Sequence, residues 1–168
     1  MSRSVSSDFR VAVYAQSTSE IPVLLVTISH DNLSVPIRVS TDNADTFDVD
    51  GTETRGTVSN GENFIFYPMQ ITLPDDSEES VTSANLVIDN IDRTIMQEIR
   101  QMTDSPTVTM QLVLASSPDV VEAEFDNFKF DSISADALTI TGQLSLGHFH
   151  REPFPGTSML PSNFAGLF

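Results

Sequence analysis

Apolar residues recur at every second position along much of the chain, which is the spacing of β-strands. The pattern is clearest in the last third, over residues 107–114, 121–130 and 138–146. Such alternation predicts strands with one buried face and one solvated face. We therefore expect a meander of three long strands here. It should have a turn at Ser116–Asp119 and a bulge at Asp126–Asn127, where the alternation slips by one residue.

Earlier segments carry related strand signals. Residues 21–30 are rich in β-branched side chains, which predicts a well-buried strand. Residues 35–40 predict its partner, and Pro36 places that strand at an edge or marks its start. Alternation within residues 64–74 predicts a half-buried strand, and residues 84–88 predict a short one.

Two segments have the spacing of a helix instead. Residues 7–16 can form an apolar stripe, with Asp8 in the first turn. From Asp92 to Met102 the apolar residues share one helix face, and Pro106 ends the segment. The sequence therefore predicts a mainly β fold, an antiparallel sandwich or barrel, with one or two short helices.

Residues 41–63 form a long polar segment that contains Asp42, Asp45, Asp48 and Asp50. We interpret it as an exposed excursion around a loose hairpin over residues 52–59. The tip of that hairpin is either Asp50–Gly51 or the turn signal at residues 59–61. A second acidic loop follows, with carboxylates at Asp75, Asp76, Glu78 and Glu79.

The length of 168 residues favours a single domain over residues 1–168. Its last part, residues 147–168, is broken by prolines but remains apolar, so we expect it to dock on its own domain or on a neighbour. The apolar residues of this C-terminal docking arm are Phe149, Phe154, Phe164, Leu167 and Phe168. The chain has no Cys, which excludes disulfides and thiolate chemistry.

Charge is the most unusual compositional feature. The chain has 24 acidic residues against 8 Lys and Arg, a formal charge of −16. Such a charge repels nucleic-acid backbones and anionic membrane surfaces. Because seven of the eight cations are arginine, fixed ion pairs at interfaces are one interpretation. Solubility alone is the other.

Candidate chemistry is sparse. We interpret His148 and His150, with Glu152 nearby, as surface or docking residues at the start of the C-terminal arm, because no third ligand stands at a known spacing. A zinc or iron site is the alternative. We interpret Asp42, Asp45 and Asp48 as part of a solvated acidic loop, and a loose calcium site is the alternative. No nucleophile elbow or phosphate-binding loop is present in the sequence. We therefore expect neither catalytic activity nor a cofactor.

The first residues lack the apolar run of a signal peptide, and no stretch approaches the roughly 20 apolar residues that span a bilayer. These features predict synthesis in the cytoplasm and no membrane segment.

Several phrases together resemble a family of small phage and prophage tail proteins of otherwise undescribed function. The phrases are Thr27–His30, Pro36–Val39, Tyr67–Pro68, Leu73–Pro74, Ile88–Arg93, Pro118–Val121 and Phe164–Phe168. Their order and spacing are also similar to the N-terminal part of the minor tail protein L family of lambda-like phages. The chain lacks the cysteine-rich C-terminal domain of that family, so a metal cluster is not implied.

The resemblance implies a tail-tube-like β-sandwich in the tail tip of a virion. Copies would form a ring between the tail tube and the hub and fibre, near the tape measure protein. DNA would pass through the ring without specific binding. On this basis we expect the acidic residues of 42–62 and 75–79 to face the channel or the next ring, and residues 147–168 to dock on a neighbour.

Two alternatives remain open. A trimeric hub is the nearer one, but hub chains often carry two tube-like domains, whereas 168 residues leave room for one. A hexamer is therefore favoured over a trimer. The other alternative is a stand-alone binding module for carbohydrate or for calcium-dependent adhesion.

Overall fold

The computed structural model describes residues 5–49, 51–72, 83–89, 104–136 and 139–146. This part of the chain is mainly β with one short helix, as the sequence predicts. The elements are α1 (Ser7–Tyr14), β1 (Pro22–Ser29), β2 (Ile37–Ser40), β3 (Asp45–Val49), β4 (Thr52–Ser59), β5 (Glu62–Phe66), β6 (Met69–Thr72), β7 (Ser83–Asp89), β8 (Thr107–Leu114), β9 (Ser117–Ala135) and β10 (Thr139–Leu146). The second predicted helix, from Asp92, lies outside the described residues.

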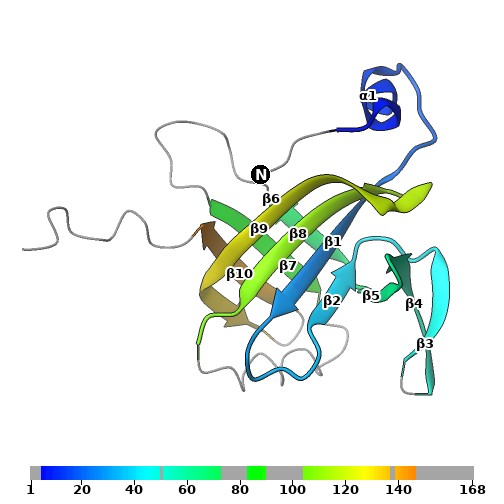
Figure 1. The fold of residues 1–168 in the computed structure, drawn as a ribbon. Coiled ribbons are helices and arrows are strands. Elements are labelled where there is room, and N and C mark those ends of the chain that lie inside the picture. The colour runs from blue at the N-terminus through cyan, green and yellow to red at the C-terminus, as the bar shows by residue number, and fades with distance from the viewer. Residues whose placement is uncertain (1–4, 50, 73–82, 90–103, 137–138, 147–168) are drawn as a thin grey trace, which may run out of the picture.

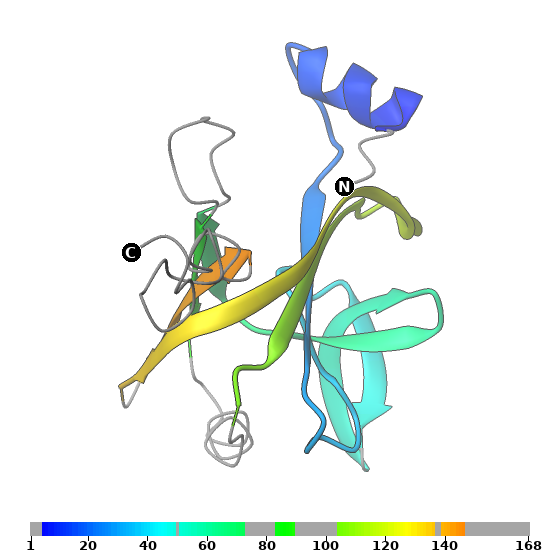
Figure 2. The same cartoon turned by 60° about the vertical axis from the view of Figure 1, so that its left-hand side comes forward.

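All ten strands belong to one sheet in the order β3-β4-β5-β2-β1-β8-β9-β10-β7-β6 (Figure 1). Neighbouring strands are antiparallel except β2 and β5, which pair in parallel. In the described part of the chain the sheet is not closed into a barrel. The sheet instead bends, as Figure 2 shows from a second side.

The bend brings the two halves of the sheet together around the main core. β1, β2 and β8 contribute one side of this core, and β7, β9 and β10 contribute most of the other. A second, smaller core lies on the opposite face of β1, where Val23 and Leu25 pack near Phe64 of β5. Strand β1 is therefore buried on both faces, as its β-branched run predicts.

The polar segment 41–63 is more ordered than we expected. It contains β3 and β4 and the start of β5, so it is part of the sheet and not only a loose hairpin. Both proposed tips are real turns. Gly51 has φ of 81°, and Asn60 and Gly61 have φ of 50° and 79°. Positive φ at two central residues is the geometry of a tight hairpin turn, which Asn-Gly favours.

Pro68 separates two strands that lie far apart in the sheet. β5, before it, pairs with β2 and β4, whereas β6, after it, pairs with β7 at the far end of the sheet. The chain leaves one strand and starts another at Pro68 because a proline has no N–H to donate to a neighbouring strand. β6 has the half-buried pattern that we predicted for this segment.

The C-terminal meander is confirmed as β8, β9 and β10. Val108 pairs with Phe128 and Met110 with Phe125, so Asp126 and Asn127 share one partner position and form the predicted bulge. Asn127 has φ of 62° there. The turn before β9 lies at Ala115–Ser116, not at residues 116–119, because β9 already begins at Ser117.

Candidate functional site

The predicted acidic residues fall into two groups. Asp42, Asp45 and Asp48 lie on or just before the β3–β4 hairpin, defined as residues 45–49 and 51–59. This hairpin forms one end of the sheet (Figure 1). The other candidates lie outside the described residues: Asp50, Asp75, Asp76, Glu78 and Glu79. His148, His150 and the C-terminal docking arm, residues 147–168, also lie outside them.

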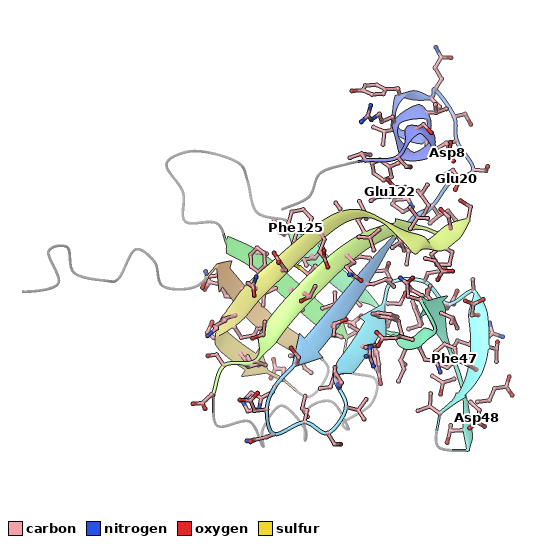
Figure 3. The ribbon with its side chains drawn as sticks, viewed as in Figure 1. Asp8, Glu20, Phe47, Asp48, Glu122 and Phe125 are labelled. Atoms are coloured by element: carbon pink, nitrogen blue, oxygen red, sulfur yellow. The ribbon has the colours of Figure 1, made fainter. Side chains whose placement is uncertain are left out.

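Two of these carboxylates hold the shape of the β3–β4 hairpin. Asp45 accepts a hydrogen bond from the Val58 amide at 3.0 Å, across the hairpin. Asp48 accepts one from the Gly51 amide at 2.8 Å and so closes the turn. Figure 3 shows Asp48 toward the far end of the hairpin, beside Phe47. Both carboxylates are solvent-exposed, so they combine a local structural role with a surface charge.

The structure does not assemble the proposed calcium site. Asp42 meets its neighbours through its backbone, with its N–H donating to Ser40 Oγ at 3.0 Å. Among the described residues, no group of three or more His, Cys, Asp or Glu side chains could hold a metal ion. The carboxylates of the hairpin therefore act as surface charges and turn acceptors.

Hydrogen bonds hold the end of the hairpin that is nearest to β5 and β9. The Ser40 and Thr57 hydroxyls lie 2.8 Å apart, and both side chains are buried. Ser59 Oγ donates to the Pro118 carbonyl at 2.7 Å, and the Asn60 amide donates to Asp119 at 2.6 Å. These bonds fix the β4–β5 turn against β9, so the hairpin projects in a defined direction.

A second surface feature is the N-terminal helix α1. Its N-cap is Ser6, whose hydroxyl accepts from the Phe9 amide at 3.1 Å. The Ser6 hydroxyl and amide also donate to the two carboxylate oxygens of Glu122, at 2.6 and 2.7 Å. Glu122 is only 2% exposed. Sequence alternation placed it on the solvated face of its strand, which is wrong.

The described surface also has two hollows of about 460 Å³ each. The first lies on the outer face of β6, β7, β9 and β10, and hydroxyl and amide side chains line most of it: Thr72, Asn85, Ser132, Ser134, Thr141 and Gln143. The second includes Ser29 and His30. Ser29 Oγ donates to the Thr107 carbonyl at 3.4 Å, and His30 Nδ1 accepts from the Asn32 amide at 3.0 Å. Their hydrogen bonds therefore serve the backbone rather than each other.

No helix in the described ranges combines the length and the apolar character needed to cross a membrane. The described surface thus includes a charged hairpin, an exposed helix and two hollows.

Comparison with known proteins gives a family without an assigned activity. No curated protein matches the chain. A family model described as "Domain of unknown function (DUF1833)" matches residues 8–158, which include all ten strands. The chain therefore belongs to the DUF1833 family.

Proposed function

We propose that the chain is a structural virion protein of a long-tailed phage. Copies would form a ring at the distal tail or baseplate hub, link the tail tube to the hub and fibre, and surround part of the DNA ejection channel. The resemblance to small phage tail proteins supports this proposal. The structural observation that carries it is the open sheet, whose two edges are formed by different strands.

β3 and β6 occupy the two ends of the sheet, and no described strand pairs with their outer sides. An exposed edge offers backbone N–H and C=O groups that can pair with another chain. β3 has five residues and β6 has four, so β6 of one copy can pair along most of β3 of the next. A contact between two different surfaces closes into a ring when the rotation between copies allows it.

We favour six copies because one chain supplies one tube-like unit for each position of a six-fold tube. Three copies, as in a trimeric hub, remain the alternative. In either ring the exposed carboxylates of the β3–β4 hairpin face the channel or the adjacent ring. Negative charge along a channel repels DNA phosphates, so DNA can pass without being bound.

A stand-alone carbohydrate-binding module is the second candidate. The observation in its favour is the hollow lined by hydroxyl and amide side chains, which can hydrogen-bond to sugars. No aromatic residue is among the described residues that line it, so the hollow offers no ring for stacking against a sugar. The open sheet edges favour the ring.

Location in the virion tests the proposed function. Purified virions of the phage that encodes the chain are labelled with a gold-conjugated antibody raised against it, and an antibody to a capsid protein serves as the control. We expect gold at the distal end of the tail. Label confined to the capsid, or intact virions that lack the chain, would refute the proposal.

The channel assignment has its own test. Asp75, Asp76, Glu78 and Glu79 are replaced together by lysine. Each replacement adds two charge units, so the four together make the formal charge of each copy eight units less negative than −16. If these residues face the channel, assembled particles should release DNA more slowly, because the new cations attract phosphates. Normal assembly with an unchanged rate of DNA release would show that these four residues do not face the channel.

A further inference from the structure

The β4–β5 turn contains the only asparagine in the sequence that is followed by glycine, the pair Asn60–Gly61. Asparagine is thermolabile, because the backbone nitrogen of the next residue can attack its side-chain amide. A side chain on that next residue hinders the attack, and glycine has none. Among the asparagines of the sequence, Asn60 therefore has the least hindered neighbour for this reaction.

The structure leaves the Asn60–Gly61 turn open. Both residues are exposed to solvent. Apart from the residues next to it in the chain, no heavy atom lies within 4 Å of the position that a Cβ on Gly61 would occupy. The peptide between the two residues must rotate to bring the Gly61 nitrogen to the Asn60 side chain. The open space around Gly61 permits that rotation.

Asn127 offers a contrast within the same molecule. It is also exposed, and its φ of 62° is close to the φ of 50° at Asn60. The next residue, however, is Phe128, which is 0% exposed. Phe128 pairs with Val108 of β8 on one side and with Leu146 of β10 on the other. Because this neighbour is bulky and held by two strands, Asn127 should not undergo the same reaction.

We propose that Asn60 is a site of spontaneous deamidation, which converts the β4–β5 turn to an acidic form. The backbone nitrogen of Gly61 forms a bond to Cγ of Asn60, the Cγ–Nδ2 bond breaks, and ammonia leaves with the proton of the Gly61 nitrogen. Water then opens the cyclic imide. Opening at Cγ gives aspartate, and opening at the backbone carbonyl gives isoaspartate, which lengthens the main chain by a carbon atom. Water is the co-reactant, and no atom is oxidised or reduced.

The hydrogen bonds of the turn show what the reaction changes. The Asn60 side-chain amide donates to Ser59 Oγ at 3.4 Å and to the Asp119 carbonyl at 3.5 Å. The Asn60 backbone amide donates to the Asp119 carboxylate at 2.6 Å. An ionised carboxylate cannot donate a hydrogen bond. At position 60 it would lie near the carbonyl and the carboxylate of Asp119, so repulsion would replace attraction.

Deamidation would therefore detach the β4–β5 turn from β9. The contacts of Asn60 with Asp119 are among those that fix this turn, together with the bond from Ser59 Oγ to the Pro118 carbonyl. Their loss would loosen the end of the β3–β4 hairpin that is nearest to β9. The inference does not depend on the proposed ring, because every step takes place within a single chain.

Prolonged incubation of the purified chain in neutral buffer tests the reaction. Peptide mass spectrometry should find a gain of about one mass unit in the peptide that contains Asn60, since a carboxylic acid replaces an amide. Both aspartate and isoaspartate should be present. The peptide that contains Asn127 should keep its mass and serves as the internal control. Asn60→Gln should keep its mass as well, because the longer side chain would have to close a larger ring.

A second measurement tests the effect on the turn. Asn60→Asp reproduces the aspartate product, and Asn32→Asp is the matched control because Asn32 is an exposed residue of another turn. We expect hydrogen exchange of the β5 amides to become about tenfold faster in Asn60→Asp, which corresponds to about 1.4 kcal/mol. In Asn32→Asp the same amides should exchange as in the wild type. Circular dichroism of both variants should match the wild type.

Three results would overturn the proposal. If Asn60 reacts in urea but keeps its mass in the folded chain, the turn protects it and the site is wrong. If Asn127 reacts as fast as Asn60, the open turn does not select the site. If hydrogen exchange in Asn60→Asp equals that of the wild type, deamidation does not detach the turn. None of these results bears on the phage tail function, which the location of the chain in virions tests separately.

Discussion

A glycine in the main core lies against an aromatic ring, and this contact can be tested in detail. A Cβ on Gly142 of β10 would lie 2.1 Å from Cε1 and 2.6 Å from Cδ1 of Phe130 in the neighbouring strand. Carbon atoms in van der Waals contact are about 3.5–4.0 Å apart, so Gly142→Ala must displace the ring or the strand by about 1.4 Å or more. Phe130 is 5% exposed, which leaves the ring little room to move.

The expected cost follows from overpacking. Forcing a methyl group into a well-packed core lowers the free energy of unfolding by about 1–3 kcal/mol. For a domain of this size each kcal/mol corresponds to a loss of about 2–4 °C in Tm. Phe130→Leu removes the ring atoms that the new methyl group meets. The double variant should therefore lose less stability than the two single variants together, by about 0.5–3 kcal/mol.

Gly56 of β4 provides the contrasting control. A Cβ there would lie 1.8 Å from the backbone carbonyl oxygen of Phe64, an atom that no side-chain replacement removes. Gly56→Ala should thus remain destabilising when Phe64→Leu is added. Urea denaturation of all variants, followed by circular dichroism, measures both pairs. If Gly142→Ala and Phe130→Leu add within about 0.5 kcal/mol, the ring does not obstruct position 142 and our reasoning is refuted.

Two further predictions concern local structure. Asn127→Ala should lower the free energy of unfolding by about 1–2 kcal/mol, because alanine is strained at a φ of 62°, whereas Asn127→Gly should preserve stability in the same urea assay. Equal losses for alanine and glycine would contradict this explanation. Glu122→Ala should remove the acceptor of both Ser6 hydrogen bonds, each worth about 1.5–3 kcal/mol, and hydrogen exchange in α1 should accelerate. Unchanged exchange over residues 7–14 would show that Glu122 does not anchor the helix.

Local sequence patterns correctly predicted the strands in which the apolar residues occupy the buried positions. β1 reads as a well-buried strand because both of its faces pack, against the main core and against Phe64. The bulge at Asp126–Asn127 was also predictable, since a bulge shifts the alternation of buried side chains by one position. In these cases the sequence period and the three-dimensional environment carry the same information.

The β3–β4 hairpin shows where that correspondence ends. β3 has no fully buried side chain, and aspartate is depleted in strands, so the segment reads as a polar loop. Its strands form because they pair with each other, with Asp45 opposite Gly56 and Val49 opposite Thr52. Backbone pairing across a tight turn does not require apolar residues at every second position, so the sequence pattern does not reveal it.

Glu122 was mispredicted for a non-local reason. Its position between Val121 and Ala123 indicates a solvated side chain, but Ser6 covers it from 116 residues away in sequence. β9 is also irregular there, because Leu112 pairs with Ala123 and Val113 with Val121. No local pattern reports such a contact, so the anchor of α1 could not be found from the sequence.

The charge distribution also bears on how copies would meet in the proposed ring. If β3 paired with β3 of another copy, the exposed carboxylates of Asp45 and Asp48 would approach their own counterparts, and like charges on adjoining strands are destabilising. β6, from Met69 to Thr72, has no charged residue, so it can pair with β3 without that repulsion. Charged edge strands are a common means of preventing unwanted pairing. The aspartates of β3 therefore disfavour a symmetric β3–β3 dimer and favour the head-to-tail contact that a ring requires.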